Sequence, residues 1–271
     1  MSDWITLTLR AAPDGPIRVH GLHPDRLTDH RSPQIAALRV SIGRQAAQLG
    51  DFFVIEGERS SRVRVEGSSH LVNGLGAGML GGELVIDGDA GAWTGAGMGG
   101  GTLHVHGSVG DDAGVRMSGG VLRIDGNAGA RLGGNAPGAA TGMTGGEIIV
   151  AGSAGAEAAA RMRRGLVVVG GDVGRDAGRA MIAGSLYVFG SCGDGPGRGS
   201  KRGSIVACSD ITVPPTYRYA CTYQPPHVRL TLLHLLRRHG LKVEVSLIDG
   251  TFRRYCGDAG DPGKGEILVR V

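Results

Sequence analysis

The sequence predicts a fold dominated by β-strands: a right-handed parallel β-helix, or solenoid, with glycine-rich coils of 19 residues. Three observations lead to this fold class. Six methionines recur at spacings of 19, 19, 26, 19 and 19 residues, and a glycine follows nine residues after each. Each repeat contains a short segment with apolar residues at every second position, as a half-buried strand requires. Units of this length cannot bury an apolar face alone, so neighbours must stack. The methionines are Met79, Met98, Met117, Met143, Met162 and Met181.

The chain before the repeat, residues 1–78, is expected to form an N-terminal cap with degenerate first coils. Two segments have the alternation of strands, WITLTLR at 4–10 and DFFVIEGE at 51–58. The segment RVRVEG at 62–67 is a candidate for a degenerate first coil. The cap would cover the first open edge of the stack.

Residues 79–207 carry the glycine-rich coils. Glycine pairs such as Gly81–Gly82 are placed where the chain turns between faces, because positive φ is cheap only for glycine. Seven extra residues near 131–138 (RLGGNAPG) predict a loop that protrudes from the third coil. The inward columns are expected to be Leu84, Leu103, Leu122, Ile148, Val167 and Leu186, together with Ile86, Val105, Ile124, Val150, Val169 and Val188.

Residues 208–271 are expected to form a C-terminal extension of helix and strands. Two prolines precede HVRLTLLHLLRRHG, which predicts an amphipathic helix that ends at Gly240 with basic residues in its last turn. Strands are predicted at 242–248 and 266–271. Such an extension would protect the other open end of the stack.

Composition excludes several functional classes. The net charge is +4, but basic residues form no runs of five or more, so nucleic acid binding is not expected. The N-terminus lacks a secretion signal and no stretch approaches 18 apolar residues, so we expect a cytoplasmic protein without membrane contact. The four cysteines have no metal or redox spacing, which predicts buried, reduced thiols.

Residues able to do chemistry are sparse. His104 and His106 alternate on the outward face of one strand, where Asp87 and Asp125 flank His106 in the neighbouring coils. A surface metal site is one interpretation and solvated polar side chains are the other; because a third ligand is not evident, we expect no metal site. No paired carboxylates and no histidine beside a nucleophile stand out, so no catalytic residue is assigned.

Two groups of residues are candidates for an interface. The outward column at Ile149, Val168 and Tyr187 is apolar, with Phe189 one column away, and such a strip must be covered by the C-terminal segment of the chain or by another subunit. A basic cluster is the second group, and it predicts a solvated corner or a docking site for an acidic partner or polyanion. Its members are Arg161, Arg163 and Arg164.

The 19-residue glycine-rich coils, the preceding LGDFFVIEGE at 49–58 and FRRYCGDAGDPGKGEILV at 252–269 together resemble the C-type subunits of formylmethanofuran dehydrogenases. The similarity is greater to the C-type subunit of the related bacterial formyltransferase/hydrolase complex. The repeat register is shared with a wider group that includes the GXGXG β-helix domain of glutamate synthase large subunits.

This resemblance implies a structural subunit that binds partners of the A, B and D types. The complex would transfer the formyl group of formyl-tetrahydromethanopterin to methanofuran and release formate in one-carbon metabolism. The resemblance also implies that this chain binds no cofactor of its own, because methanofuran, tetrahydromethanopterin and the metals are handled by the complex. Two alternatives stay open: the C-type subunit of a molybdenum or tungsten formylmethanofuran dehydrogenase, and a stand-alone β-helix enzyme or glutamate-synthase-like domain.

Overall fold

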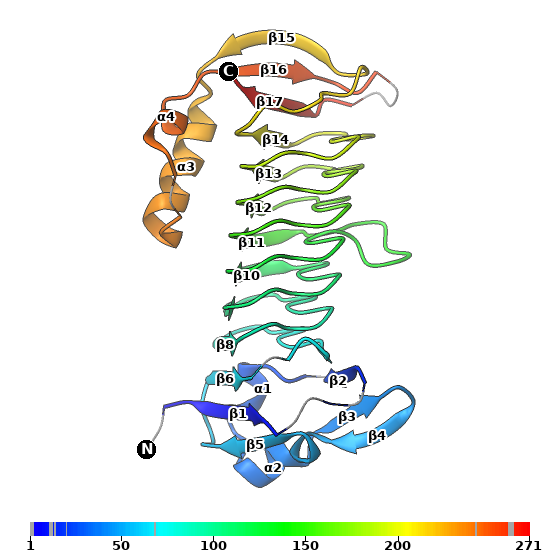
Figure 1. Cartoon of the computed structure of the whole chain (residues 1–271), viewed down its shortest axis with the longest axis vertical. Coiled ribbons are helices and arrows are strands. Elements are labelled where there is room, and N and C mark those ends of the chain that lie inside the picture. The colour runs from blue at the N-terminus through cyan, green and yellow to red at the C-terminus, as the bar shows by residue number, and fades with distance from the viewer. Residues whose placement is uncertain are drawn as a thin grey trace.

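The computed structural model describes residues 3–10, 13, 15–19, 21–67, 69–241, 243–259 and 263–271. Strands dominate this part of the chain (Figure 1), in one large, mostly parallel sheet of 13 strands and a second sheet of four. The helices lie at the N-terminal end and along one side of the large sheet. Within these residues no helix has both the length and the apolar character needed to cross a bilayer.

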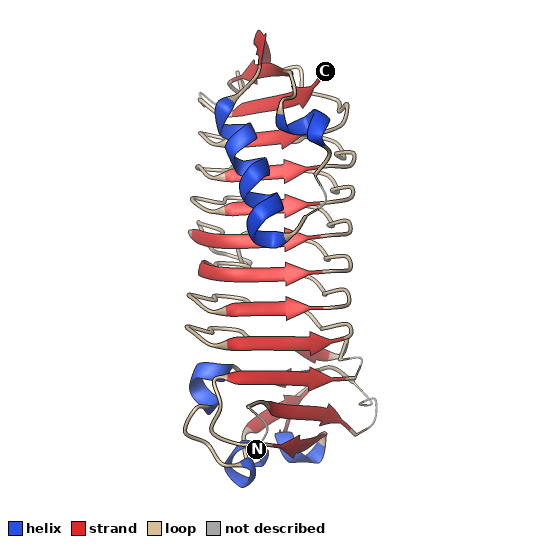
Figure 2. Cartoon of the chain, turned by 90° about the vertical axis from the view of Figure 1, so that its left-hand side faces the viewer, coloured by secondary structure: helices blue, strands red, loops and turns tan. Residues whose placement is uncertain are grey.

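The central strands of the large sheet pair in parallel with their neighbours in sequence. They are β8 (Glu83–Asp87), β9 (Thr102–Val105), β10 (Ser118–Ile124), β11 (Gly145–Val150), β12 (Leu166–Val169), β13 (Ser185–Val188) and β14 (Ser204–Ala207). Residues one repeat apart lie side by side, as Leu84 and Leu103 do. A second line of parallel bridges runs from Ser69 to Cys192. Each turn of the chain therefore lies on the preceding one and contacts it along two lines (Figure 2).

The core of the stack lies between these two lines. All the residues predicted for the two inward columns are fully buried, and so are the six repeat methionines, which confirms the predicted register. Methionine suits this position because its unbranched side chain fills irregular gaps. Burial of each large apolar side chain contributes about 1.5–3 kcal/mol before the cost in conformational entropy.

The predicted glycine corners have a steric cause. A Cβ atom on Gly100 would lie 2.2 Å from the carbonyl oxygen of Leu80 in the coil before it. The next residue, Gly101, has φ of +77°, which L-residues with side chains rarely adopt. Close stacking of the coils at this corner therefore requires glycine.

The N-terminal region extends the large sheet and adds the second one. The predicted strands at 4–10 and 51–58 are confirmed as β1 (Ile5–Leu9) and β5 (Phe53–Glu56), and 62–67 contains β6 (Arg62–Glu66). Strand β6 is parallel to β8 and β1, whereas β5 is antiparallel to β1 and ends the sheet. The second sheet and the short helices are β4 (Gln45–Gln48), β3 (Arg39–Ile42), β2 (Ile17–Val19), β7 (Val72–Asn73), α1 (Pro24–Leu27), α2 (Ser32–Ala36) and the 3₁₀ turn at Leu49–Asp51.

The C-terminal region closes the other end of the large sheet. Strand β17 (Glu266–Arg270) continues the parallel order after β14, and β16 (Phe252–Cys256) and β15 (Arg218–Tyr223) follow in antiparallel order. The predicted helix is confirmed as α3 (Pro226–His239), with Gly240 in the left-handed conformation after it. The predicted strand at 266–271 corresponds to β17.

The predicted strand at 242–248 is wrong. Its described part contains a short helix, α4 (Val245–Ile248), and Lys242 lies outside the described residues. Strands β17, β16 and β15 continue the sheet at this end, and the segment packs Val243 and Leu247 with the residues under α3 instead.

The inserted residues form a loop between β10 and β11, which projects from the stack in Figure 1. Leu132, at its start, is still fully buried. The side-chain amide of Asn135 donates to the carbonyls of Ala136 and Ala139 and so closes the loop on itself. The insertion therefore leaves the core of its coil intact.

Candidate functional site

The outward face of the large sheet changes character along one column of residues. Neighbours in this column pair in register. In order, the column is Val85, His104, Arg123, Ile149, Val168 and Tyr187. We call Val85 to Arg123 the polar half and Ile149 to Tyr187 the apolar half. Helix α3 crosses the apolar half in Figure 2, and among the described residues no helix lies over the polar half.

The apolar half is covered by the chain itself. Ile149, Val168 and Tyr187 are 3%, 0% and 1% exposed and pack with Val228, Leu232 and Leu235 of α3. Phe189 is partly buried against the same cluster. Burial raises the pKa of Tyr187 to about 12, an effect that a hydrogen bond with Thr231 of α3 partly offsets. Of the two occupants considered for this strip, the structure supplies the C-terminal segment, and these three side chains offer no surface to a partner.

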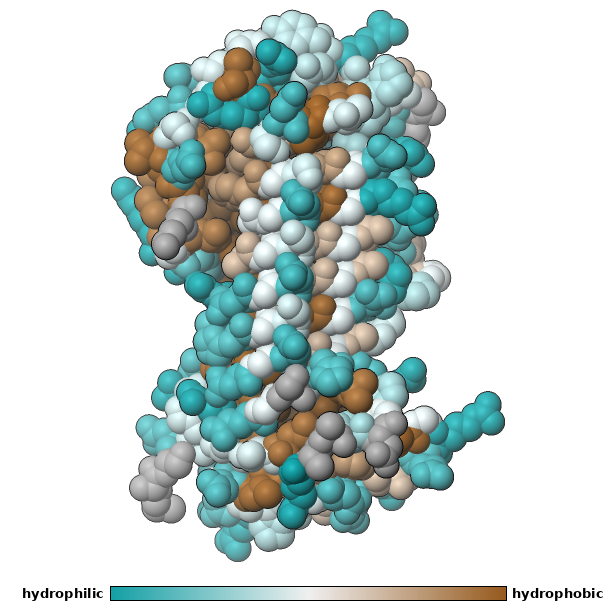
Figure 3. Space-filling view, viewed as in Figure 1, coloured by the Kyte–Doolittle hydropathy of each residue, from teal (hydrophilic) through white to brown (hydrophobic). Residues whose placement is uncertain are grey.

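The outer surface of α3 and α4 carries apolar residues that sequence analysis missed. Leu230, Leu236 and Val245 are 65%, 40% and 76% exposed. Figure 3 shows apolar side chains gathered on this flank of the molecule. The signal was present in the sequence, since Leu230 lies about 200° around the helix from the buried Val228.

A carboxylate fixes the last turn of α3 to the sheet. Glu147 of β11 lies with Oε2 2.7 Å from Nε2 of His239 and with Oε1 3.1 Å from Nε2 of His234. Arg238 contributes a weaker ion pair at 3.9 Å. Partial burial raises the pKa of Glu147, but the hydrogen bonds with His239 and His234 outweigh it and leave the pKa below its ordinary value. Glu147 is therefore ionised at neutral pH.

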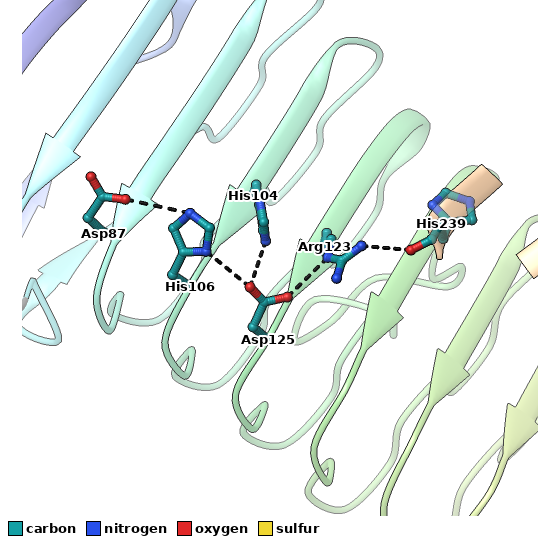
Figure 4. A network of polar contacts seen from close by, with 6 residues as sticks. All are labelled: Asp87, His104, His106, Arg123, Asp125 and His239. Atoms are coloured by element: carbon teal, nitrogen blue, oxygen red, sulfur yellow. Dashed lines mark hydrogen bonds and ion pairs between the residues drawn. The ribbon is translucent and has the colours of Figure 1, made fainter. Parts of the chain in front are cut away.

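Arg123 connects this helix end to the polar half. Its Nη1 donates to the carbonyl of His239 over 2.8 Å, and its Nε donates to Oδ1 of Asp125 over 3.0 Å (Figure 4). The carbonyls of the last helical turn have no partner inside the helix, so Arg123 supplies a donor that the carbonyl of His239 would otherwise lack.

The polar half gathers two imidazoles around one carboxylate oxygen. Oδ2 of Asp125 lies 2.8 Å from Nε2 of His104 and 3.0 Å from Nδ1 of His106. The other ring nitrogen of His106 faces Asp87 over 3.6 Å. Partial burial raises the pKa of Asp125, but hydrogen bonds with Arg123, His106 and His104 more than compensate and hold the pKa below its ordinary value. Asp125, which sequence analysis placed beside His106, thus supplies a third potential ligand atom to the two imidazoles.

Neither cluster includes a serine or cysteine nucleophile. All four cysteines are unpaired, as predicted, but the prediction of burial is not met: Cys221, in the edge strand β15, is exposed and the other three are partly buried. Burial raises the pKa of Cys192 to about 11 and that of Cys208 to about 12, so both thiols are protonated at neutral pH. What the two clusters can do chemically is hold a proton or a metal ion.

The basic cluster divides in the structure. Arg163 and Arg164 line an open recess of about 670 Å³ with Lys201, Arg202 and Lys264. Arg161 instead donates to the carbonyl of Ala140 in the inserted loop. Ile182, Ala183 and Gly184, in the coil between the two basic pairs, also line the recess. The repeat register could have found Lys201 and Arg202, since they follow Arg163 and Arg164 by two coils.

A solved structure is similar to this chain over nearly its whole length. It is a chain in the crystal structure of the formyltransferase/hydrolase complex (FhcABCD) from Methylorubrum extorquens in complex with methylofuran. The two chains are 34% identical and superpose with a TM-score of 0.91, and the match covers 98% of this chain and 99% of the other. No protein-family model and no curated protein sequence matches the chain.

Proposed function

The chain belongs to the family of a subunit of the formyltransferase/hydrolase complex, and we propose that it is the non-catalytic, C-type structural subunit of such a complex. The match of the whole chain at 34% identity carries the proposal. The C-type assignment rests on the resemblance of the coils and of the segments at 49–58 and 252–269.

The proposed complex converts formyl-tetrahydromethanopterin through formylmethanofuran to formate, in the oxidation of formaldehyde in the cytoplasm. The methylofuran present in the similar complex supports this substrate class. The proposal assigns both reactions, and the binding of the coenzymes and metals, to partners of the A, B and D types. The chain supplies a rigid support that keeps two distant sites at a fixed separation, so that an intermediate passes between them without release.

We propose that the stacked coils form a right-handed parallel β-helix of the GXGXG type. The in-register parallel strands and the second line of bridges support a β-helix, and the strong preference of parallel crossovers for the right hand supports its handedness. In this interpretation residues 1–78 form the cap, residues 79–207 the repeats and residues 208–271 the extension that carries α3.

Two surfaces are proposed to bind partner subunits. The first is the outer face of α3 and α4 with Leu230, Leu236 and Val245, because exposed apolar residues gathered on one flank are typical of interfaces. The second is the basic recess of Arg163 and Arg164, which suits an acidic surface. Arg161 contacts the inserted loop and contributes to the second surface only indirectly.

The function is tested by purification of the tagged chain from its native host, followed by mass spectrometry and formate-release assays. We expect larger subunits to co-purify and to release formate from formyl-tetrahydromethanopterin without an electron acceptor. A requirement for an acceptor would favour the molybdenum or tungsten dehydrogenase. A chain that purifies alone and without activity would contradict the proposal.

The surfaces are tested by Leu230→Asp with Leu236→Asp, and separately by Arg163→Glu with Arg164→Glu. We expect weaker assembly in both cases and unchanged activity of the separated partner subunits. The matched control is Leu80→Asp, a leucine that is 71% exposed at a different corner. Equal assembly of all variants would remove both surfaces from the proposal.

A further inference from the structure

We propose that His104, His106 and Asp125 form a binding site for a divalent transition-metal ion, with zinc as the best-suited ion. The ligand atoms of these three side chains all lie within 4.8 Å of one another. Two imidazoles and one carboxylate are a ligand set that zinc accepts, with a fourth position left for water.

The backbone fixes this arrangement before any ion arrives. His104 and His106 alternate on one face of β9 and the residue after it, and their ring centroids are 4.1 Å apart. Asp125 follows β10, which is hydrogen-bonded in register to β9. Ligands held on adjacent strands of a stacked sheet lose little conformational entropy on binding.

The distances are close to those that a metal needs. Tetrahedral zinc with bonds of about 2.0–2.1 Å holds its ligand atoms about 3.3 Å apart. Here Asp125 Oδ2 is 2.8 Å from His104 Nε2 and 3.0 Å from His106 Nδ1. Small rotations of the side chains, which are 26% (His104), 47% (His106) and 31% (Asp125) exposed, open the gap. The same exposure gives an ion access from solvent.

Neighbouring side chains orient the ligands. Nδ1 of His106 lies 3.0 Å from Asp125 and Nε2 lies 3.6 Å from Asp87, so when an ion replaces the proton on Nδ1, Asp87 faces the remaining N–H. Arg123 donates to Oδ1 of Asp125 and leaves Oδ2 for the ion. The carboxylates of Asp87 and Asp125 are matched by Arg64 and Arg123, so the converging ligand atoms, rather than an excess of negative charge, favour an ion here.

The other imidazole cluster is less suited to an ion. His234 and His239 meet different oxygens of Glu147, whereas His104 and His106 converge on one oxygen of Asp125. The His239 side chain is only 6% exposed, and the cluster lies under the last turn of α3. Its contacts stabilise the docking of the helix.

The test is titration of the full chain, purified without a histidine tag, with Zn²⁺ by calorimetry and with Co²⁺ by visible absorption. We expect a single high-affinity ion and the absorption of tetrahedral cobalt. His104→Ala with His106→Ala is expected to abolish binding. Asp125→Asn is expected to weaken it, and Asp87→Asn to weaken it by about tenfold through loss of the orienting contact.

The matched controls are His227→Ala and His234→Ala. These histidines lie on α3, outside the proposed site, and their removal is expected to leave binding unchanged. Binding that survives in the His104 and His106 double variant, or that disappears in His234→Ala, would overturn the proposal. Nitrogen NMR of the imidazoles in the unaltered chain gives a second readout. Resonances of His104 and His106 that do not move with added Zn²⁺ would also overturn it.

Discussion

The polar and apolar halves of one outward column have the same backbone and opposite surroundings. His104 and Val168 both lie in parallel strands, each paired in register with the strand before and after it. The residues beneath them, in the inward columns, are equally buried in both halves. Only the outward side chain differs, and it decides whether the face stays in water or receives α3. The repeated inward residues thus form the core of the stack, and the outward residues, which differ from coil to coil, determine what covers its surface.

The largest effect is expected from the same substitution in each half. Val168→Asp would bury an unpaired charge under α3 and is expected to lower the free energy of unfolding by about 3 kcal/mol or more. Val85 is 8% exposed but lies beside Arg64, so Val85→Asp places its charge next to a cation and is expected to cost less than Val168→Asp. Denaturant unfolding measures both. If Val168→Asp cannot be purified, Val168→Ala, with a smaller loss, replaces it, and equal losses at the two sites would show that the halves do not differ.

Two adjacent leucines of α3 separate the covered side of the helix from its outer side. Leu235 is fully buried against the apolar half, whereas Leu236 is 40% exposed. Leu235→Ala is expected to cost about 2–4 kcal/mol by leaving a cavity, and Leu236→Ala less than about 0.5 kcal/mol. Limited proteolysis of the helix gives a second measurement. A larger loss for Leu236→Ala would mean that α3 is docked with a different face.

Acid is expected to weaken the boundary between the halves. The pKa of Glu147 in the folded chain lies below its ordinary value of 4.5. The ionised carboxylate therefore stabilises the fold fully above pH 4.5, and this contribution is lost as the pH falls through the lowered pKa. Glu147→Gln should be less stable than the unaltered chain at neutral pH, and the difference should shrink below pH 4.5. Melting temperatures of both proteins across this range test it; a constant difference would exclude Glu147 as the titrating group.

The smallest effect concerns the arginine that joins the halves. Arg123→Ala removes the hydrogen bond to the carbonyl of His239 and is expected to cost about 1 kcal/mol. The loss should appear as faster hydrogen exchange in the last turn of α3. Arg64→Ala, which removes an ion pair of 3.6 Å in the polar half, should leave that turn unchanged. Equal exchange in both variants would show that Arg123 does not hold the helix.

The sequence predicted those features that depend on local order. Strict spacing placed the buried methionines and the inward columns, and two prolines and Gly240 marked the ends of α3. The partner of the apolar strip could not be predicted, because Val168 and Leu232 meet only in three dimensions. The same limit explains the wrong strand at 242–248: alternating Val243, Val245 and Leu247 suit a strand, but Val243 and Leu247 pack with the residues under α3.

The candidate site shows the same division. The outward placement of His104 and His106 followed from alternation alone, but the closure of Asp125 onto both rings depends on side-chain rotation that a sequence does not reveal. The basic recess is an intermediate case. The register of its two basic pairs was visible in the sequence, whereas Lys264, which also lines it, comes from the C-terminal region and reaches it only in three dimensions.

Helix α3 also sets a limit on the length of the molecule. Its first turn meets the sheet where His227 lies 3.8 Å from Glu266 of β17, and its last turn where His239 meets Glu147 of β11. The two glutamates occupy one register column, four strand steps apart, a span of about 19 Å. The two histidines are separated along the helix by about 18 Å. A coil gained or lost between β11 and β17 would break this agreement unless α3 changed by about three residues. Coils in the polar half are under no such constraint, so the chain can change its length there alone.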